Sequence, residues 1–309
     1  MSGALPPEQR GLRGAVADLL ETRSPETEVR RLMADEGGYD PALWSELAAM
    51  GLLGLVIPET FGGSGAGAAE LAVACEQMGR ALLCAPYLST AVLSANLLLA
   101  LGDTAEQNDV LPRIAAGGLI TSVAFAEPGS ARPAEVPLTV AARNADDWRL
   151  TGTKAYVLDA AVAQRFYVHA RTEAGTAMFA VDPTAPGLDI SPSSTVDQTR
   201  KQGTLTLADT PARLIGSAAA GGSALAETLD RAAVALLAEQ SGGAMHTMRM
   251  AADYARTRFQ FGRAIGSFQA VKHMCADMLL EAESAVSAAR HVAAAFDADS
   301  PDRYADLAL

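Results

Sequence analysis

Apolar residues in the first third of the chain recur with the period of an α-helix. Over residues 8–20 the apolar side chains lie three or four positions apart, on one helical face. Asp40 followed by Pro41 predicts a helix start, because aspartate caps free backbone N–H groups and proline is tolerated in the first turn. The same periodicity predicts further helices over 70–83, 90–101 and 106–116, with a glycine-rich loop over 51–67.

The period changes at Leu119. From there to residue 217, short segments alternate apolar and polar residues, and Gly, Pro, Asn or Asp separates them. This pattern is typical of half-buried β-strands. The sequences at 144–147 and 173–176 predict hairpin turns. We therefore expect one antiparallel β domain in this part of the chain.

Helical periodicity returns at about Gly222 and predicts two long helices, one to Arg258 and one from near Gly266 to Phe296. A short last helix is expected after Ser300 as its cap, and a helix of about eight residues is marginal alone. We expect either that this helix docks on a partner or that the chain is a truncated form of a longer protein. The chain is thus expected to divide into a helical domain (1–118), a β domain (119–217) and an incomplete helical domain (218–309).

Composition narrows the function classes. The 309 residues carry a formal net charge of −12, whereas binding nucleic acid or an anionic membrane surface requires a basic patch. Cys75, Cys84 and Cys275 form no metal-binding or disulfide pattern, so no metal is expected and a reducing, cytoplasmic setting fits. No signal peptide is recognised at the N-terminus, and the most apolar stretch, 88–101, is too short to cross a bilayer.

The most informative motif is YARTRFQFGRAIGSFQAVKHMCADM at 254–278. Arg258 and Gln269 flank a glycine-containing turn between the two long helices. A guanidinium can clamp a pyrophosphate, a helix start adds backbone donors, and an amide can bond an adenine edge. Phe261 adds an apolar ring. The alternative is that Arg258 pairs with a surface carboxylate while Gln269 is solvated.

This motif and the runs at 44–67 and 70–82 resemble the acyl-CoA dehydrogenase family of flavoproteins across essentially the whole chain. The resemblance implies an α+β multi-domain fold, with an N-terminal helical domain, a middle antiparallel β-barrel-like domain and a C-terminal helical bundle. It implies FAD as cofactor and α,β-desaturation of an acyl-CoA thioester. It also implies that one set of residues contacts the pyrophosphate and adenine end of an FAD held mainly by the neighbouring subunit: Arg258, Phe261, Ile265, Phe268 and Gln269.

The β domain departs from the family pattern. A threonine of the usual Thr-Glu-Pro is Ala126, and the following Gly-Ser-Asp is Ala131-Arg132-Pro133. The later Trp-Ile-Thr is Tyr156-Val157-Leu158. Each lost hydroxyl removes a hydrogen bond to the flavin, worth about 1 kcal/mol. The chain's own flavin pocket is therefore expected to be impaired, with Glu127-Pro128-Gly129 kept only as a structural turn.

No catalytic base is identified. The family places this carboxylate either in a C-terminal segment not contained in this chain or at a helix position that is Ala232 here. Glu239 is the nearest later carboxylate, and a water-facing surface role is favoured for it over that of base. A partner residue is the other candidate. The histidines, His169, His246, His273 and His291, are assigned no chemistry.

One hypothesis accounts for two observations. The residues expected to contact the FAD of a neighbouring subunit are retained, whereas those expected to form the chain's own flavin pocket are replaced. The chain resembles a subunit of the heteromeric (α2β2) bacterial steroid-degrading type, acting with a second acyl-CoA dehydrogenase-like subunit on a bulky or sterol-derived thioester. The alternatives are a fragment of an ordinary homo-oligomeric acyl-CoA dehydrogenase, a different flavin reaction such as a monooxygenase or nitroalkane oxidase, and a structural subunit without cofactor. The acyl group, the electron acceptor and whether Leu309 is the natural C-terminus stay open.

Overall fold

The computed structural model describes residues 5–130, 132–144 and 147–308. The described residues form two compact units, neither of which is one continuous stretch of chain. The first, the helical unit, consists of 1–26, 67–83 and 233–309. The second, the β unit, consists of 27–66 and 84–232 and contains the predicted β domain. The division into domains at 118 and 217 stays a prediction from the sequence.

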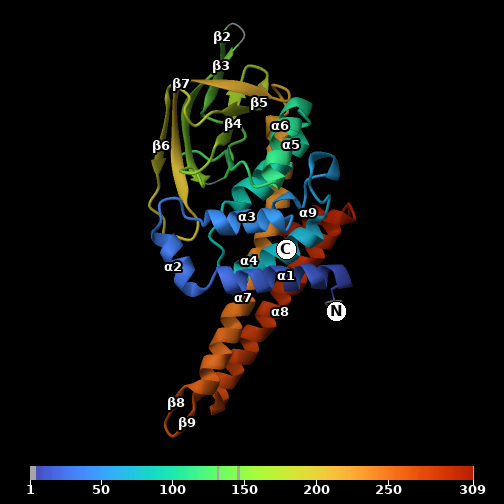
Figure 1. Ribbon diagram of the computed structural model, residues 1–309, viewed down its shortest axis with the longest axis vertical. Coiled ribbons are helices and arrows are strands. Elements are labelled where there is room, and N and C mark those ends of the chain that lie inside the picture. The colour runs from blue at the N-terminus through green and yellow to red at the C-terminus, as the bar shows by residue number, and fades with distance from the viewer. Residues whose placement is uncertain (1–4, 131, 145–146, 309) are drawn as a thin grey trace. The chain divides into compact units, whose positions relative to one another are not determined.

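The helices fall where the periodicity predicts them, with one addition at residues 26–34. They are α1 (Pro7–Arg23), α2 (Glu26–Ala34), α3 (Pro41–Ala49), α4 (Ala68–Arg80), α5 (Ala95–Leu101), α6 (Thr104–Ala115), α7 (Gly221–Thr257), α8 (Gln269–Asp297) and α9 (Arg303–Ala308) (Figure 1). Short 3₁₀ turns at Leu52–Gly54 and Glu59–Phe61 interrupt the predicted loop. Among the described residues, none of these helices has the length and apolar character needed to span a membrane.

Two predicted helices differ in detail from the expectation. The buried helix expected over 90–101 begins as a π-helix, Leu88–Ser94, before continuing as α5. Its buried Ser89, Thr90 and Ser94 hydroxyls all form hydrogen bonds, which satisfies their polar groups inside the core. The last helix starts at Arg303 rather than at Pro301, because Ser300 to Asp302 form a turn in which the Asp302 N–H donates to the Ser300 hydroxyl.

The described residues of the β domain form one sheet of seven strands. They are β1 (Thr121–Ala124), β2 (Val140–Asn144), β3 (Asp147–Leu158), β4 (Arg165–Thr172), β5 (Gly175–Val181), β6 (Leu188–Pro192) and β7 (Gln202–Ile215). The pairings β4–β2–β3–β7–β5–β4 close into a ring, and β1 and β6 pair outside it, with β4 and β7. The predicted antiparallel arrangement holds for most pairs, but β1 and β2 both pair with β4 in parallel.

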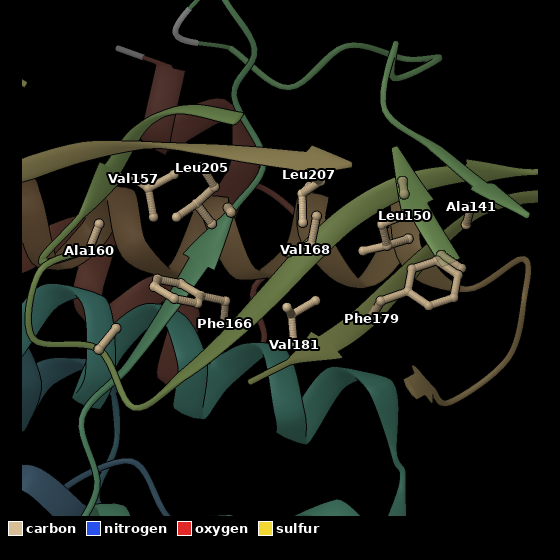
Figure 2. Packing of buried hydrophobic residues seen from close by; sticks show 14 residues of the cluster. Ala141, Leu150, Val157, Ala160, Phe166, Val168, Phe179, Val181, Leu205 and Leu207 are labelled. Atoms are coloured by element: carbon tan, nitrogen blue, oxygen red, sulfur yellow. The ribbon is translucent and has the colours of Figure 1, made fainter. Parts of the chain in front are cut away.

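The inside of this ring is filled by apolar side chains. Figure 2 shows residues of β3, β4, β5 and β7 meeting there, among them Leu150, Phe166, Val168, Phe179, Leu205 and Leu207. These residues are at most 2% exposed. Alternation along each strand places every second side chain in this core, which is the period predicted from the sequence. The turn at 173–176 joins β4 to β5, as predicted. The turn predicted at 144–147 includes Ala145 and Asp146, which lie outside the described residues.

In the helical unit, two glycines bring α4 and α7 into backbone contact. A Cβ atom added at Gly79 would lie 1.9 Å from the carbonyl oxygen of Glu239. One added at Gly242 would lie 1.8 Å from the carbonyl oxygen of Glu76. Real Cβ atoms do not approach that closely, so only glycine fits at either position.

Candidate cofactor-binding site

The motif at 254–278 folds as a hairpin between the two longest helices. The strands β8 (Phe259–Gln260) and β9 (Arg263–Ala264) pair antiparallel, and a 3₁₀ turn, Ile265–Ser267, leads into α8 (Figure 1). Phe261 and Gly262 form the turn with φ of 55° and 77°. Positive φ at both central residues is the type I′ geometry that two-residue hairpins favour, although Phe is an unusual residue for it.

Arg258 lies at the base of this hairpin and its side chain is exposed. Its backbone is held on both sides, because its N–H donates to Tyr254 at 2.8 Å and its carbonyl accepts from Ile265 at 2.8 Å. In the described part of the chain no carboxylate forms an ion pair with its guanidinium. The surface ion pair considered for Arg258 as an alternative is therefore not seen among these residues.

The aromatic residues of the hairpin form a small stack. The rings of Phe261 and Phe268 meet edge to face, with centroids 6.2 Å apart, and the Arg263 guanidinium lies 3.9 Å from the Phe268 ring centre. Phe268 and Ile265 are half-buried, but Phe261 remains 90% exposed. The exposed ring of Phe261 is therefore accessible to a ligand or to another chain.

Gln269 is the first residue of α8, and its side chain is exposed. No side chain caps this helix start among the described residues. The first-turn N–H groups are therefore available to an anion, and the helix dipole favours negative charge there. The structure thus gathers Arg258, Phe261, Ile265, Phe268 and Gln269 in one hairpin and helix start. Their role as cofactor contacts stays a prediction.

The residues predicted to border the chain's own flavin pocket, Ala126 and 156–158, lie in the β unit. The Ala155 N–H donates to the Ala126 carbonyl at 3.0 Å, so the loop after β1 is bonded to β3. Tyr156 is at an irregularity of β3, with φ of 57°, and is 48% exposed. Leu158 is half-buried. Both segments in which family hydroxyls are missing are therefore neighbours, whereas Ala131 lies outside the described residues.

Glu127 has a larger role than the turn predicted from the sequence. Its carboxylate accepts hydrogen bonds from the Lys154 ammonium at 2.8 Å, from the N–H groups of Leu138 and Thr139, and from the Thr139 hydroxyl. Burial opposes the charge of Glu127, but these four donors outweigh it and lower its pKa to about 2. All carboxylate bonds go to the chain itself, so Glu127 positions the loop.

The sequence reasoning missed Lys154, which is fully buried and also donates to the Phe125 carbonyl at 3.4 Å. A usable signal was present, because a lysine within a buried strand requires a carboxylate partner.

The carboxylates near the family's base position differ in burial. Ala232 is buried in α7 and contributes no acid. Glu239 is half-buried and interacts with another group. Its side chain is therefore less exposed to water than the sequence predicted. Asp230, which sequence reasoning did not single out, is half-buried, and desolvation together with the charge of Glu227 raises its pKa. A raised pKa suits a carboxylate that accepts a proton.

Comparisons with known proteins agree with the fold. The family model "Acyl-CoA dehydrogenase, N-terminal domain" matches residues 6–118, and "Acyl-CoA dehydrogenase, C-terminal domain" matches 219–308. Acyl-CoA dehydrogenase IpdE2 of Mycobacterium tuberculosis is 32% identical over 291 residues, which cover 94% of this chain and 76% of IpdE2. Acyl-CoA dehydrogenase FadE27 of the same species is 33% identical over 271 residues, or 86% of this chain and 69% of FadE27.

Solved structures agree as well. A structure described as "Tcur3481-Tcur3483 steroid ACAD G363A variant" has a TM-score of 0.85 and 35% identity, covering 97% of this chain and 80% of that one. The ChsE4-ChsE5 complex from Mycobacterium tuberculosis has a TM-score of 0.88 and 29% identity, covering 99% of this chain and 81% of that one. FAD is the cofactor of this family, and the exposed guanidinium, ring and uncapped helix start at 258–269 fit a dinucleotide. The chain belongs to the acyl-CoA dehydrogenase family of FAD-dependent oxidoreductases.

Proposed function

We propose that this chain is one subunit of a heteromeric acyl-CoA dehydrogenase and that it binds the nucleotide end of an FAD held mainly by its partner. The observation that carries the proposal is the hairpin at 258–269, where Arg258 has no ion-pair partner in the described chain and Phe261 is 90% exposed. Two chains are named in each of two similar structures, Tcur3481-Tcur3483 and ChsE4-ChsE5, which supports a second subunit here.

The roles of the hairpin residues follow from their chemistry. The Arg258 guanidinium would pair with pyrophosphate oxygens, and its fixed backbone limits the freedom lost on binding. Phe261, Ile265 and Phe268 would give apolar contact, and the Gln269 amide would bond an adenine edge. Bound FAD supplies the acceptor for the hydride removed from the acyl-CoA β-carbon.

The β unit supports the partner-bound arrangement. Ala126 and Leu158 have no hydroxyl to offer a flavin, and the Glu127 carboxylate is fully engaged by Lys154 and Thr139. The substrate class we propose is a bulky or sterol-derived acyl-CoA thioester, which the name of the steroid ACAD relative supports. The alternative is an ordinary homo-oligomeric acyl-CoA dehydrogenase.

Purification of the chain alone and together with the acyl-CoA dehydrogenase-like protein encoded beside it tests the proposal. We expect a colourless lone chain and a yellow complex, judged by visible absorption. Arg258→Gln should lower flavin occupancy of the complex, whereas the nearby Arg256→Gln, which breaks only an exposed pair with Asp253, should leave it unchanged. A yellow lone chain that oxidises acyl-CoA would favour the homo-oligomeric enzyme.

The proton acceptor is tested in the same complex. Glu239→Gln and Asp230→Asn remove the two candidate carboxylates of α7 with little change of volume. A loss of kcat with flavin occupancy preserved would assign the base to this chain. Full activity of both variants would assign it to the partner subunit.

A further inference from the structure

A second basic site lies in the helical unit, away from the hairpin. A cavity of about 450 Å³ is bounded by α1, α4, α7 and α8. Four of its lining residues are arginines, one on each helix: Arg13, Arg80, Arg249 and Arg290. In a chain with a net charge of −12, this local gathering of positive charge is unusual.

Within the described ranges, one of the four arginines is neutralised by a carboxylate. Arg290 pairs with Glu76, with its Nη2 atom 2.8 Å from a carboxylate oxygen. For Arg13, Arg80 and Arg249 no carboxylate lies within ion-pair distance in the parts of the chain that the structure describes. Glu283 is the other acid lining the cavity, and it is exposed. Four guanidinium groups therefore face two carboxylates, leaving an excess of two positive charges.

This charge and the remaining lining define a ligand class. Guanidinium groups bind phosphate oxygens through paired N–H donors, and an excess of two charges matches a phosphomonoester or pyrophosphate. Ala17, Met245 and Val286 add apolar surface, and the volume is that of an organic ligand rather than of a bare ion. We propose that this cavity binds an organic phosphate of nucleotide size.

The cavity is separate from the FAD contacts proposed above. Arg249 lies in α7 nine residues before Arg258, which follows the end of that helix, and nine residues correspond to about 14 Å along a helix. The walls from α1 and α4 contribute nothing to the hairpin, and the lining residues of α8 begin at Glu283, which is 14 positions after Gln269. The proposal therefore does not depend on where FAD binds.

Isothermal titration calorimetry of the full chain with inorganic pyrophosphate and with ADP tests the site. We expect both to bind, ADP more tightly because its nucleoside contacts the apolar lining. The double variant Arg80→Gln, Arg249→Gln should weaken both by roughly tenfold or more, since bonds to charged groups are lost. Arg80→Lys with Arg249→Lys, which retains the charges, should keep part of the affinity.

Two control variants separate this site from other basic positions. Arg231→Gln lies on the same helix but pairs with Glu227 outside the cavity, and it should leave both affinities unchanged. Arg258→Gln tests whether the two ligands bind the hairpin instead of the cavity. Absence of binding, or a loss caused by Arg258→Gln instead of the Arg80 and Arg249 pair, would overturn the proposal. Circular dichroism of each variant checks that the helices are intact.

Discussion

The ammonium group of Lys154 lies 2.8 Å from a carboxylate oxygen of Glu127, and both side chains are buried. This contact joins β3 to the loop after β1, which contains Ala126 where the family resemblance predicts a flavin-binding threonine. Since a buried charge without its partner is strongly destabilising, the pair is expected to determine the stability of the β unit.

Lys154→Met should lower the free energy of unfolding by roughly 3 kcal/mol at pH 7, because Glu127 would be left buried without its countercharge. The loss should be smaller at pH 4, where Glu127 without the lysine can take up a proton. Urea unfolding at both pH values measures this. The control is Arg231→Met, which breaks an exposed pair and should change stability by less than about 1 kcal/mol. A similar effect of both variants would contradict the prediction.

Asp159→Asn should stabilise the protein above pH 6. Burial raises the pKa of Asp159 to about 6, although the Ser89 hydroxyl donates to its carboxylate at 2.6 Å. The folded pKa is above the unfolded value, so ionisation of the unfolded chain reduces stability as pH rises from about 4 to 6. Above about pH 6 the free energy of unfolding is lowered by the full amount, roughly 3 kcal/mol.

Asparagine accepts the same hydrogen bond without a charge and tolerates the φ of 51° at this position. Thermal unfolding should therefore show a higher melting temperature for Asp159→Asn than for the unsubstituted protein at pH 8, but not at pH 4. An equal gain at both pH values would mean that the charge of Asp159 is not the cause.

Phe261→Asn should raise stability and lower FAD binding together. Phe261 has φ of 55° next to Gly262, and Asn-Gly is a favoured pair for this type of turn. Relief of the strained backbone should add about 1 kcal/mol. Loss of the exposed ring should reduce flavin occupancy of the complex, measured by absorbance. Phe261→Tyr keeps the ring and should keep the occupancy; if Asn also kept it, the ring would have no part in cofactor binding.

Gly242→Ala should destabilise the helical unit by roughly 2 kcal/mol, because its Cβ would lie 1.8 Å from the Glu76 carbonyl oxygen and would force α4 and α7 apart. The adjacent glycine provides a matched control. A Cβ at Gly243 would meet its nearest atom at 3.7 Å, an ordinary contact, so Gly243→Ala should raise stability by up to about 1 kcal/mol. Denaturant unfolding distinguishes the two variants, and equal effects would argue against the close approach.

Local signals in the sequence predicted the elements well. Asp40 caps α3 as expected, with its carboxylate accepting from the Ala42 N–H at 2.9 Å, and the change of period at Leu119 marks the β domain. These features depend on residues a few positions apart, so a single sequence contains them. The short helix α2 was missed, because its buried positions, Val29 and Leu32, are too few to establish a period.

Contacts between distant residues were the part that the sequence did not reveal. Parallel pairing of β1 with β4 depends on a crossover connection, which no turn residue in the sequence predicts. Lys154 and Glu127 are 27 positions apart. The arginines around the cavity come from four helices, so their proximity emerges only after packing. For the candidate cofactor site, the motif placed all five residues in one hairpin and helix start, since they lie within one short segment.

The touching backbones at Gly79 and Gly242 also restrict how this protein can evolve. Neither position can gain a side chain while the two helices keep their present spacing, and each lies against the partner helix's main chain, which cannot be trimmed by mutation. A lineage in which either glycine is replaced must therefore first have moved these helices apart. The two positions should accordingly change late, and together with their neighbours, as related sequences diverge.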